Sequence, residues 1–171
     1  MHLNSSAYIV QKAEQTVKSA GSRNPQRIAD ALGLCVRYVP FKKQKGVYAV
    51  IERSRYIFLK EDLSSVEEGI VLLHEVGHDV LHRHEAAVFQ EFSVFDRAGG
   101  RMEYEANLFA AEIMLPDEEI LEYIYRGYDT AQIAACMGSD SNLVALKARE
   151  LIARGYDFRG QEHRDDFLKG R

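Results

Sequence analysis

The sequence predicts an α+β fold, in which a small antiparallel or mixed β-sheet packs on helices and a helical bundle follows at the C-terminus. Three observations support this prediction. The β-type segments are confined to residues 34–60, and stretches with a helical spacing of apolar residues flank them on both sides. The chain has 171 residues, of which 46% are hydrophobic and 28% charged, as in one ordinary globular domain.

The N-terminal part of the chain predicts two helices and three strands. Residues 6–20 form an amphipathic pattern that ends at a turn-forming cluster over 21–25, and a short helix over 26–32 then stops at Gly33. The two-residue gap between the last two strands predicts a hairpin. The expected strands are residues 34–41, 46–52 and 55–60.

A long helix over about 66–82 follows the strands. Ser64 with Glu67, or Ser65 with Glu68, can form a capping box at its start, because each pair has the spacing at which side chain and backbone cap each other. The segment 85–100 carries three phenylalanines and ends in two glycines, so we expect a loop there.

The C-terminal half predicts further helices. Residues 101–115 form a strong helix that Pro116 stops, and two or three helical segments follow within 117–154, with breaks at Gly127 and Gly138. The polar tail 155–171 is expected to be loosely ordered.

Charge, apolar runs and cysteines exclude several classes of protein. The formal net charge of −4 argues against direct nucleic-acid binding, because phosphate neutralisation needs a basic surface. The longest apolar runs have five residues, too few for a transmembrane helix or a secretory signal. Two cysteines far apart, without a CxxC motif, favour a reducing cytoplasmic location.

The long helix contains an HExxH motif over residues 74–78. His74 and His78 lie one turn apart on the same face, so both imidazoles can reach one zinc ion. Glu75 can accept a proton from an attacking water that zinc has acidified. The histidines lie beside the apolar stripe of the helix. Gly77, which is unfavourable inside a helix, indicates close packing of another backbone or is merely tolerated. An ordinary pair of surface histidines is the alternative.

A catalytic zinc site needs a third protein ligand. His82 shares the face but lies another turn along the axis, about 5.4 Å away, so we expect it to be structural or to support a ligand. His84 has the spacing of the last histidine in HExxHxxGxxH, but that motif needs glycine where this chain has Leu81. The third candidate is a carboxylate on the helix 101–115.

A helical wheel separates the carboxylates of that helix. Glu103 lies at the rim of the apolar face, whereas Glu105 and Glu112 point to its outer side. A carboxylate directed inward needs a partner, and a metal ion is a suitable one. Asn107, one turn after Glu103, can accept a hydrogen bond from a ligand imidazole. An ordinary rim carboxylate is the alternative for Glu103.

Two stretches together resemble the ImmA/IrrE family of metallopeptidases. They are HEVGHDVLH at residues 74–82 and EYEANLFAAEIMLP at 103–116, and the segment IADALGL at 28–34 with a short sheet after it also fits. HExxH alone occurs in many families, but its pairing with E-x-x-A-N-x-F-A-A-E-x-x-x-P is more specific. The resemblance covers about residues 25–120.

This resemblance implies a thermolysin-like core. It implies zinc bound by His74, His78 and Glu103, with Glu75 as the general base. We therefore expect three parts, namely an N-terminal helix, a zinc metallopeptidase core, and a C-terminal helical region with a polar tail. Their boundaries are 1–24, 25–116 and 117–171.

The resemblance also implies a substrate, a helix-turn-helix transcriptional repressor that is cleaved to derepress genes of a mobile element or a stress response. Only about 25 residues precede the family region, so the repressor is expected to be a separate chain. One alternative is a module that binds a repressor or toxin without cleaving it, although the intact Glu75 counts against this. Another is a DNA-binding regulator acting through residues 129–152, which resemble a helix-turn-helix but lie in an acidic region.

Three details of the proposed chemistry stay open at this stage. Either strand 46–52 or strand 55–60 could hold a substrate as an added β-strand. The phenylalanines of the loop 85–100 either fill the core or belong to a lid over the cleft. The oxyanion could be stabilised by any of Tyr48, Tyr56, Tyr104, His82 and Arg101.

Overall fold

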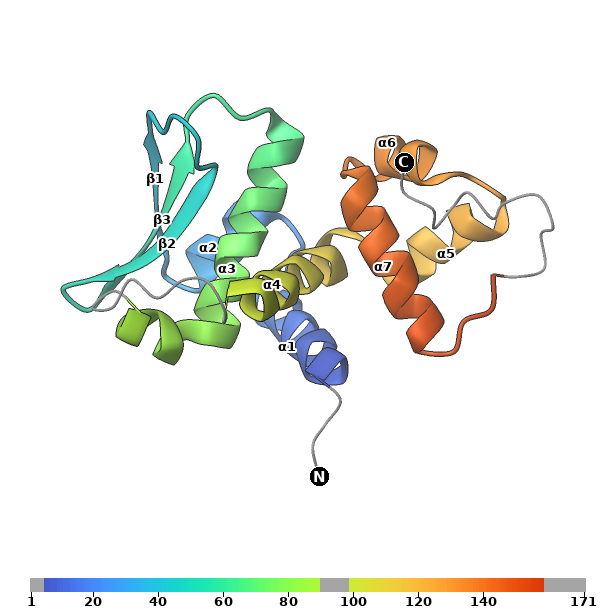
Figure 1. Ribbon diagram of the computed structural model, residues 1–171, viewed down its shortest axis with the longest axis horizontal. Coiled ribbons are helices and arrows are strands. Elements are labelled where there is room, and N and C mark those ends of the chain that lie inside the picture. The colour runs from blue at the N-terminus through green and yellow to red at the C-terminus, as the bar shows by residue number, and fades with distance from the viewer. Residues whose placement is uncertain (1–4, 90–98, 159–171) are drawn as a thin grey trace.

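The computed structural model describes residues 5–89 and 99–158 and confirms the α+β fold (Figure 1). A three-stranded sheet and the helices beside it form one part of the molecule, and the last three helices gather at the other end. In chain order the elements are α1 (Ser5–Ala20), α2 (Pro25–Ala31), β1 (Cys35–Val39), β2 (Gly46–Ile51), β3 (Ser54–Lys60), α3 (Ser65–Phe89), α4 (Gly99–Met114), α5 (Asp117–Tyr125), α6 (Thr130–Met137) and α7 (Ser141–Ala153).

The sheet is mixed, with β3 as its central strand. β1 pairs with β3 in parallel, and β2 pairs with β3 antiparallel, with Tyr48 opposite Ile57. β2 and β3 form the predicted hairpin. Its turn residues Glu52 and Arg53 have φ values of 48° and 67°, as a two-residue hairpin turn with right-handed strand twist requires. β2 is therefore an edge strand, whereas β3 is paired on both sides.

Helix α3 begins at the first of the two predicted capping boxes. The backbone N–H of Glu67 lies 3.3 Å from Ser64 Oγ, and the backbone N–H of Ser64 lies 3.3 Å from Glu67 Oε2. The apolar stripe of α3 then packs against the sheet and α4 in the larger of two cores, where Leu73 and Val76 are fully buried. This core holds α3 in place beneath β2.

Helix α3 is longer than the sequence predicts. It continues to Phe89 through a kink at His82, where φ is −126° and ψ is 15°, whereas we expected a loop from residue 85. The expectation was wrong because residues 85–87 (Glu-Ala-Ala) are strong helix formers that outweigh the aromatic residues after them. Helix α4 likewise begins at Gly99, earlier than expected. Residues 90–98, and with them the lid hypothesis, lie outside the described residues.

Helices α5, α6 and α7 form a second core with the end of α4. Its centre consists of fully buried aliphatic side chains, to which α4 contributes Ala111 and the segment directly after α4 contributes Leu115. Gly127 and Gly138 separate the three helices at φ values of 84° and 59°, so the predicted breaks are confirmed. The predicted tail is described only to residue 158.

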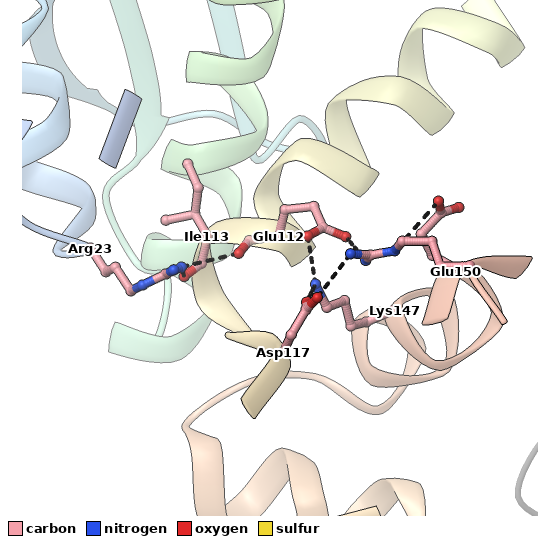
Figure 2. Close-up of polar contacts among 7 residues, drawn as sticks. Arg23, Glu112, Ile113, Asp117, Lys147 and Glu150 are labelled. Carbon is pink, nitrogen blue, oxygen red and sulfur yellow. Dashed lines mark hydrogen bonds and ion pairs between the residues drawn. The ribbon is translucent and has the colours of Figure 1, made fainter. Parts of the chain in front are cut away.

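An ion-pair cluster joins α4 to the C-terminal helices (Figure 2). Lys147 on α7 is fully buried, and its ammonium lies 2.6 Å from Glu112 Oε2 and 2.5 Å from Asp117 Oδ1. Arg154 donates to the same two carboxylates at 2.6 and 2.9 Å. The wheel-based expectation that Glu112 points outward was wrong. The outer face of α4 is covered by α7, which one helix's periodicity cannot reveal.

Two further observations bear on the class of protein. Cys35 and Cys136 are free thiols. Within residues 5–89 and 99–158, no helix is both long enough and apolar enough to cross a bilayer.

Candidate metal centre

Helices α3 and α4 approach closely beside the HExxH motif. A Cβ atom added to Gly77 would lie 3.1 Å from Ala106 Cα and 3.3 Å from its carbonyl oxygen. The absence of a side chain at Gly77 therefore allows the backbone of α4 to pass over this turn of α3, as the sequence suggested. The approach brings the first turn of α4, with Glu103, to the two histidines of the motif.

Three donor atoms converge between the helices. The Nε2 atoms of His74 and His78 lie 3.1 Å apart, and the Glu103 carboxylate lies 3.1 Å from the first and 3.3 Å from the second. Ligands at tetrahedral angles and zinc-like bond lengths are about 3.3–3.5 Å apart. The three residues form the only candidate metal cluster found among the described residues. The nearest atoms of each pair thus lie within a few tenths of an ångström of the separations that zinc requires.

The exposure of the three side chains leaves one side of the cluster open. The imidazoles are 16% and 14% exposed, whereas the Glu103 side chain is 57% exposed. Hydrogen bonds from His74 and His78 hold the pKa of Glu103 far below its usual range, so its carboxylate is ionised. Burial lowers the pKa of His74, but its hydrogen bond to Glu103 and the charge of Glu75 outweigh this effect and leave the pKa above its ordinary value.

The ring nitrogen of His74 that faces away from the cluster is also engaged. Its Nδ1 lies 2.9 Å from Asn107 Oδ1, as predicted. Because an amide oxygen only accepts, His74 carries a proton on Nδ1, so Nε2 is the nitrogen left to bind a metal ion.

Glu75 lies beside the cluster and beneath β2. It is 7% exposed, and this burial raises the pKa of its carboxyl although charges on His74 and His78 oppose the shift. The edge strand passes so close that a Cβ atom at Gly46 would lie 2.8 Å from Glu75 Oε1. Such a carboxylate suits a general base, whose pKa should approach the working pH.

The structure separates the other ligand candidates. His84 is exposed on α3 and is not part of the cluster. His82 is 4% exposed and contacts His78 through a ring nitrogen, so it supports a candidate ligand as expected. Glu105 was expected on the outer side of its helix, and this was wrong, because it is 9% exposed and pairs with His82. Glu103, by contrast, is the more exposed of the two carboxylates. The helical wheel therefore selected it as the third ligand for a wrong reason, namely that it would point inward.

Sequence reasoning missed a second buried carboxylate on α3. Asp79 is 1% exposed and accepts hydrogen bonds at 2.8 Å from both Tyr48 and Arg55. Arg83 donates to it as well, at 2.9 Å. This cluster fixes β2 and β3 to the helix that carries Glu75. The only available signal was a charged residue four positions after Glu75 on the same helix face.

The oxyanion candidates also differ in availability. The hydroxyl of Tyr48 is held by Asp79, and burial together with this hydrogen bond raises its pKa. His82 is buried away from solvent, Tyr56 stacks on Phe58, and Tyr104 is 44% exposed. Which of the candidates stabilises the oxyanion therefore stays a prediction.

The two helices bring together two imidazoles, a carboxylate and an adjacent buried glutamate. This is the arrangement of metal ligands and general base that is typical of HExxH metallopeptidases. The family model of the IrrE N-terminal-like domain, an M78 peptidase family, matches residues 29–148, so the chain belongs to this family. The expected membership in the ImmA/IrrE family is thereby confirmed.

Two curated relatives resemble most of the chain. It is 29% identical over 150 residues to Uncharacterized immunity region protein 2 of Bacillus phage phi105, covering 84% of this chain and 92% of that protein. It is 24% identical over 146 residues to Metallopeptidase ImmA of Bacillus subtilis (strain 168), covering 84% and 85%.

Proposed function

We propose that this protein is a zinc-dependent endopeptidase that acts in the cytoplasm on a separate helix-turn-helix repressor. The observation that carries the proposal is the convergence of two imidazole nitrogens and one carboxylate, whose nearest atoms lie 3.1–3.3 Å apart, with a buried glutamate next to the first histidine. The ligands are His74, His78 and Glu103. When bound, zinc would acidify a water molecule and polarise the scissile carbonyl.

The residues of the chain then perform the proton transfers. Glu75 accepts the proton of the attacking water and returns it to the leaving amine. Its confinement between α3 and β2 limits the positions open to the carboxylate, which favours an orientation in which it can accept the proton. Asn107 keeps the first imidazole in the tautomer that presents Nε2.

The edge strand β2 offers a place for the substrate backbone. Of the two strands considered from sequence, β3 is already paired on both sides, which leaves β2. An extended peptide segment paired with β2 would pass close to Glu75, because Gly46 at the start of β2 contacts this side chain. This mode of binding selects an unfolded or extended stretch of the repressor.

The proposed target rests on the family and on the relatives. One relative is named as an immunity-region protein of a phage and another as a metallopeptidase, and both align over most of their length. The burial of Lys147 on α7 favours a protein target over DNA, because this lysine is engaged in ion pairs and cannot reach a phosphate. A repressor-binding module without cleavage is the remaining alternative.

The test is the substitution Glu75→Gln, which preserves size but removes the proton acceptor. We expect zinc content and folding to be unchanged and cleavage to fall at least about 100-fold. Cleavage is assayed on casein and on a panel of purified helix-turn-helix repressors, with Glu122→Gln, on a surface side chain 57% exposed, as the matched control.

Each outcome of this test is informative. Retained cleavage by Glu75→Gln would move the general base elsewhere. A wild-type protein that binds zinc and captures a repressor, but cleaves neither repressor nor casein, would support the binding module instead.

A further inference from the structure

A buried chain of hydrogen bonds leads away from the second imidazole of the metal centre. His78 Nδ1 lies 3.3 Å from His82 Nδ1, and His82 Nε2 lies 2.9 Å from Glu105 Oε2. Glu105 Oε1 in turn accepts from Arg101 Nε at 2.8 Å. His82 and Glu105 are 4% and 9% exposed, so the contact between them is shielded from water, whereas the Arg101 side chain at the outer end is 79% exposed.

The direction of the protons along this chain follows from its outer end. Glu105 accepts from a guanidinium, which never accepts, so its carboxylate is an acceptor toward His82 as well. His82 therefore donates from Nε2. In the neutral ring Nδ1 then carries a lone pair, and this atom faces His78 Nδ1.

The same logic sets the tautomer of the metal-site histidine. When His82 Nδ1 accepts, His78 donates from Nδ1, and its Nε2 is the nitrogen left to bind a metal ion. That atom is the one that faces His74 Nε2 and Glu103. The chain of contacts thus does for His78 what the Asn107 amide does for His74, although by a different chemical group.

We infer that His82 and Glu105 form a relay that orients the His78 ring as a zinc ligand. The inference rests on the proposed metal centre. His82 and Glu105 are positioning residues here, because neither lies in the donor cluster itself. The kink of α3 falls at His82, where the helix leaves regular geometry at the residue that links His78 to α4.

The experiment compares zinc affinity in two variants of one residue. His82→Leu replaces the ring with an apolar side chain of similar size and removes the hydrogen-bond acceptor. We expect a 10- to 100-fold weaker zinc affinity, about the loss that follows removal of such a supporting partner. His82→Asn places an amide oxygen close to the former Nδ1, so it should restore part of the affinity. His84→Leu, the same change at an exposed position of α3, is the control and should leave the affinity unchanged.

Zinc affinity is measured by chelator competition on protein whose folding is verified by circular dichroism. The inference is overturned if His82→Leu binds zinc within about threefold of wild type. It is also overturned if His82→Leu and His82→Asn lose affinity equally, since the loss would then not come from the hydrogen bond.

A second measurement uses the wild-type chain loaded with zinc and needs no variant. Long-range proton–nitrogen spectra of this protein report which ring nitrogens carry protons. We expect a protonated Nδ1 on His78 and an unprotonated Nδ1 on His82. A protonated Nδ1 on His82 would overturn the relay, whereas a wild-type protein that binds no zinc would overturn the proposed function instead.

Discussion

Replacing Lys147 with methionine tests how the C-terminal helices are held on the helix that carries Glu103. Methionine has a similar length and leaves little empty volume, so the change isolates the loss of charge. Glu112 keeps Arg154 on Oε1 at 2.6 Å but loses its partner on Oε2. Asp117 is 34% exposed and can recruit water. The cost therefore falls mainly on one buried carboxylate oxygen.

The magnitude follows from the burial of this group. Breaking a buried ion pair costs about 3–5 kcal/mol, and an unsatisfied buried polar group costs about 1–3 kcal/mol. Because Arg154 remains beside Glu112, we expect a loss of about 3 kcal/mol in the free energy of unfolding for Lys147→Met. Lys45→Met, at a side chain 57% exposed, is the control and should lower the free energy of unfolding much less, because surface ion pairs contribute little.

The pH dependence gives this prediction a second signature. Burial raises the pKa of Glu112, and Lys147 is the first of the groups that oppose the shift. Without Lys147 the folded-state pKa rises further above the ordinary value of 4.5. Protonation then stabilises the folded variant, a contribution that is present at low pH and lost as pH rises through the folded pKa. The difference from wild type should therefore narrow as pH falls from 7 toward 4.5.

Urea unfolding followed by circular dichroism measures both quantities. A variant within about 0.5 kcal/mol of wild type at pH 7 would refute the reasoning. So would a difference between the two proteins that stays constant across this pH range.

Two further predictions concern β2 and the start of α3. Gly46→Ala should lower cleavage while zinc remains bound, because its Cβ would lie 2.8 Å from Glu75 Oε1; Gly100→Ala, with no atom within 4 Å, is the control, and equal activities would contradict the expectation. Glu67 has a pKa of about 2, lowered first by its hydrogen bond from Lys45, so it stabilises the fold above pH 4.5 and loses this effect as pH falls toward 2. The melting temperatures of wild type and Glu67→Gln should therefore converge over that range, and a constant difference would argue against this effect of the Glu67 charge.

Local spacing was sufficient to predict much of the fold and of the candidate site. The pair of histidines one turn apart, the capping box at Ser64 and the two-residue hairpin each depend on residues close in sequence, whose geometry the backbone fixes. The close approach of α4 at Gly77 could also be inferred, because a glycine is unfavourable inside a helix and close packing is one reason for its presence.

The remaining features depend on contacts between distant segments. Glu105 and Glu112 lie on faces of α4 that become buried only because His82 and Lys147 are brought against them. A wheel drawn for one helix assumes a single apolar face and a single solvent face. Helix α4 belongs to two cores, so this assumption fails, and partners 23 and 35 residues away decide which carboxylates are inside.

Zinc binding by wild type and by Glu103→Gln tests the central claim most directly. The amide keeps the size of the side chain but not the charge of the third ligand. Purified wild type should bind one zinc per chain. Changes to residues that only support a ligand weaken metal binding by up to about 100-fold, and Glu103→Gln should weaken zinc binding by more than this. Glu119→Gln, on an exposed residue, should match wild type. A Glu103→Gln protein that binds zinc as tightly as wild type would contradict the account.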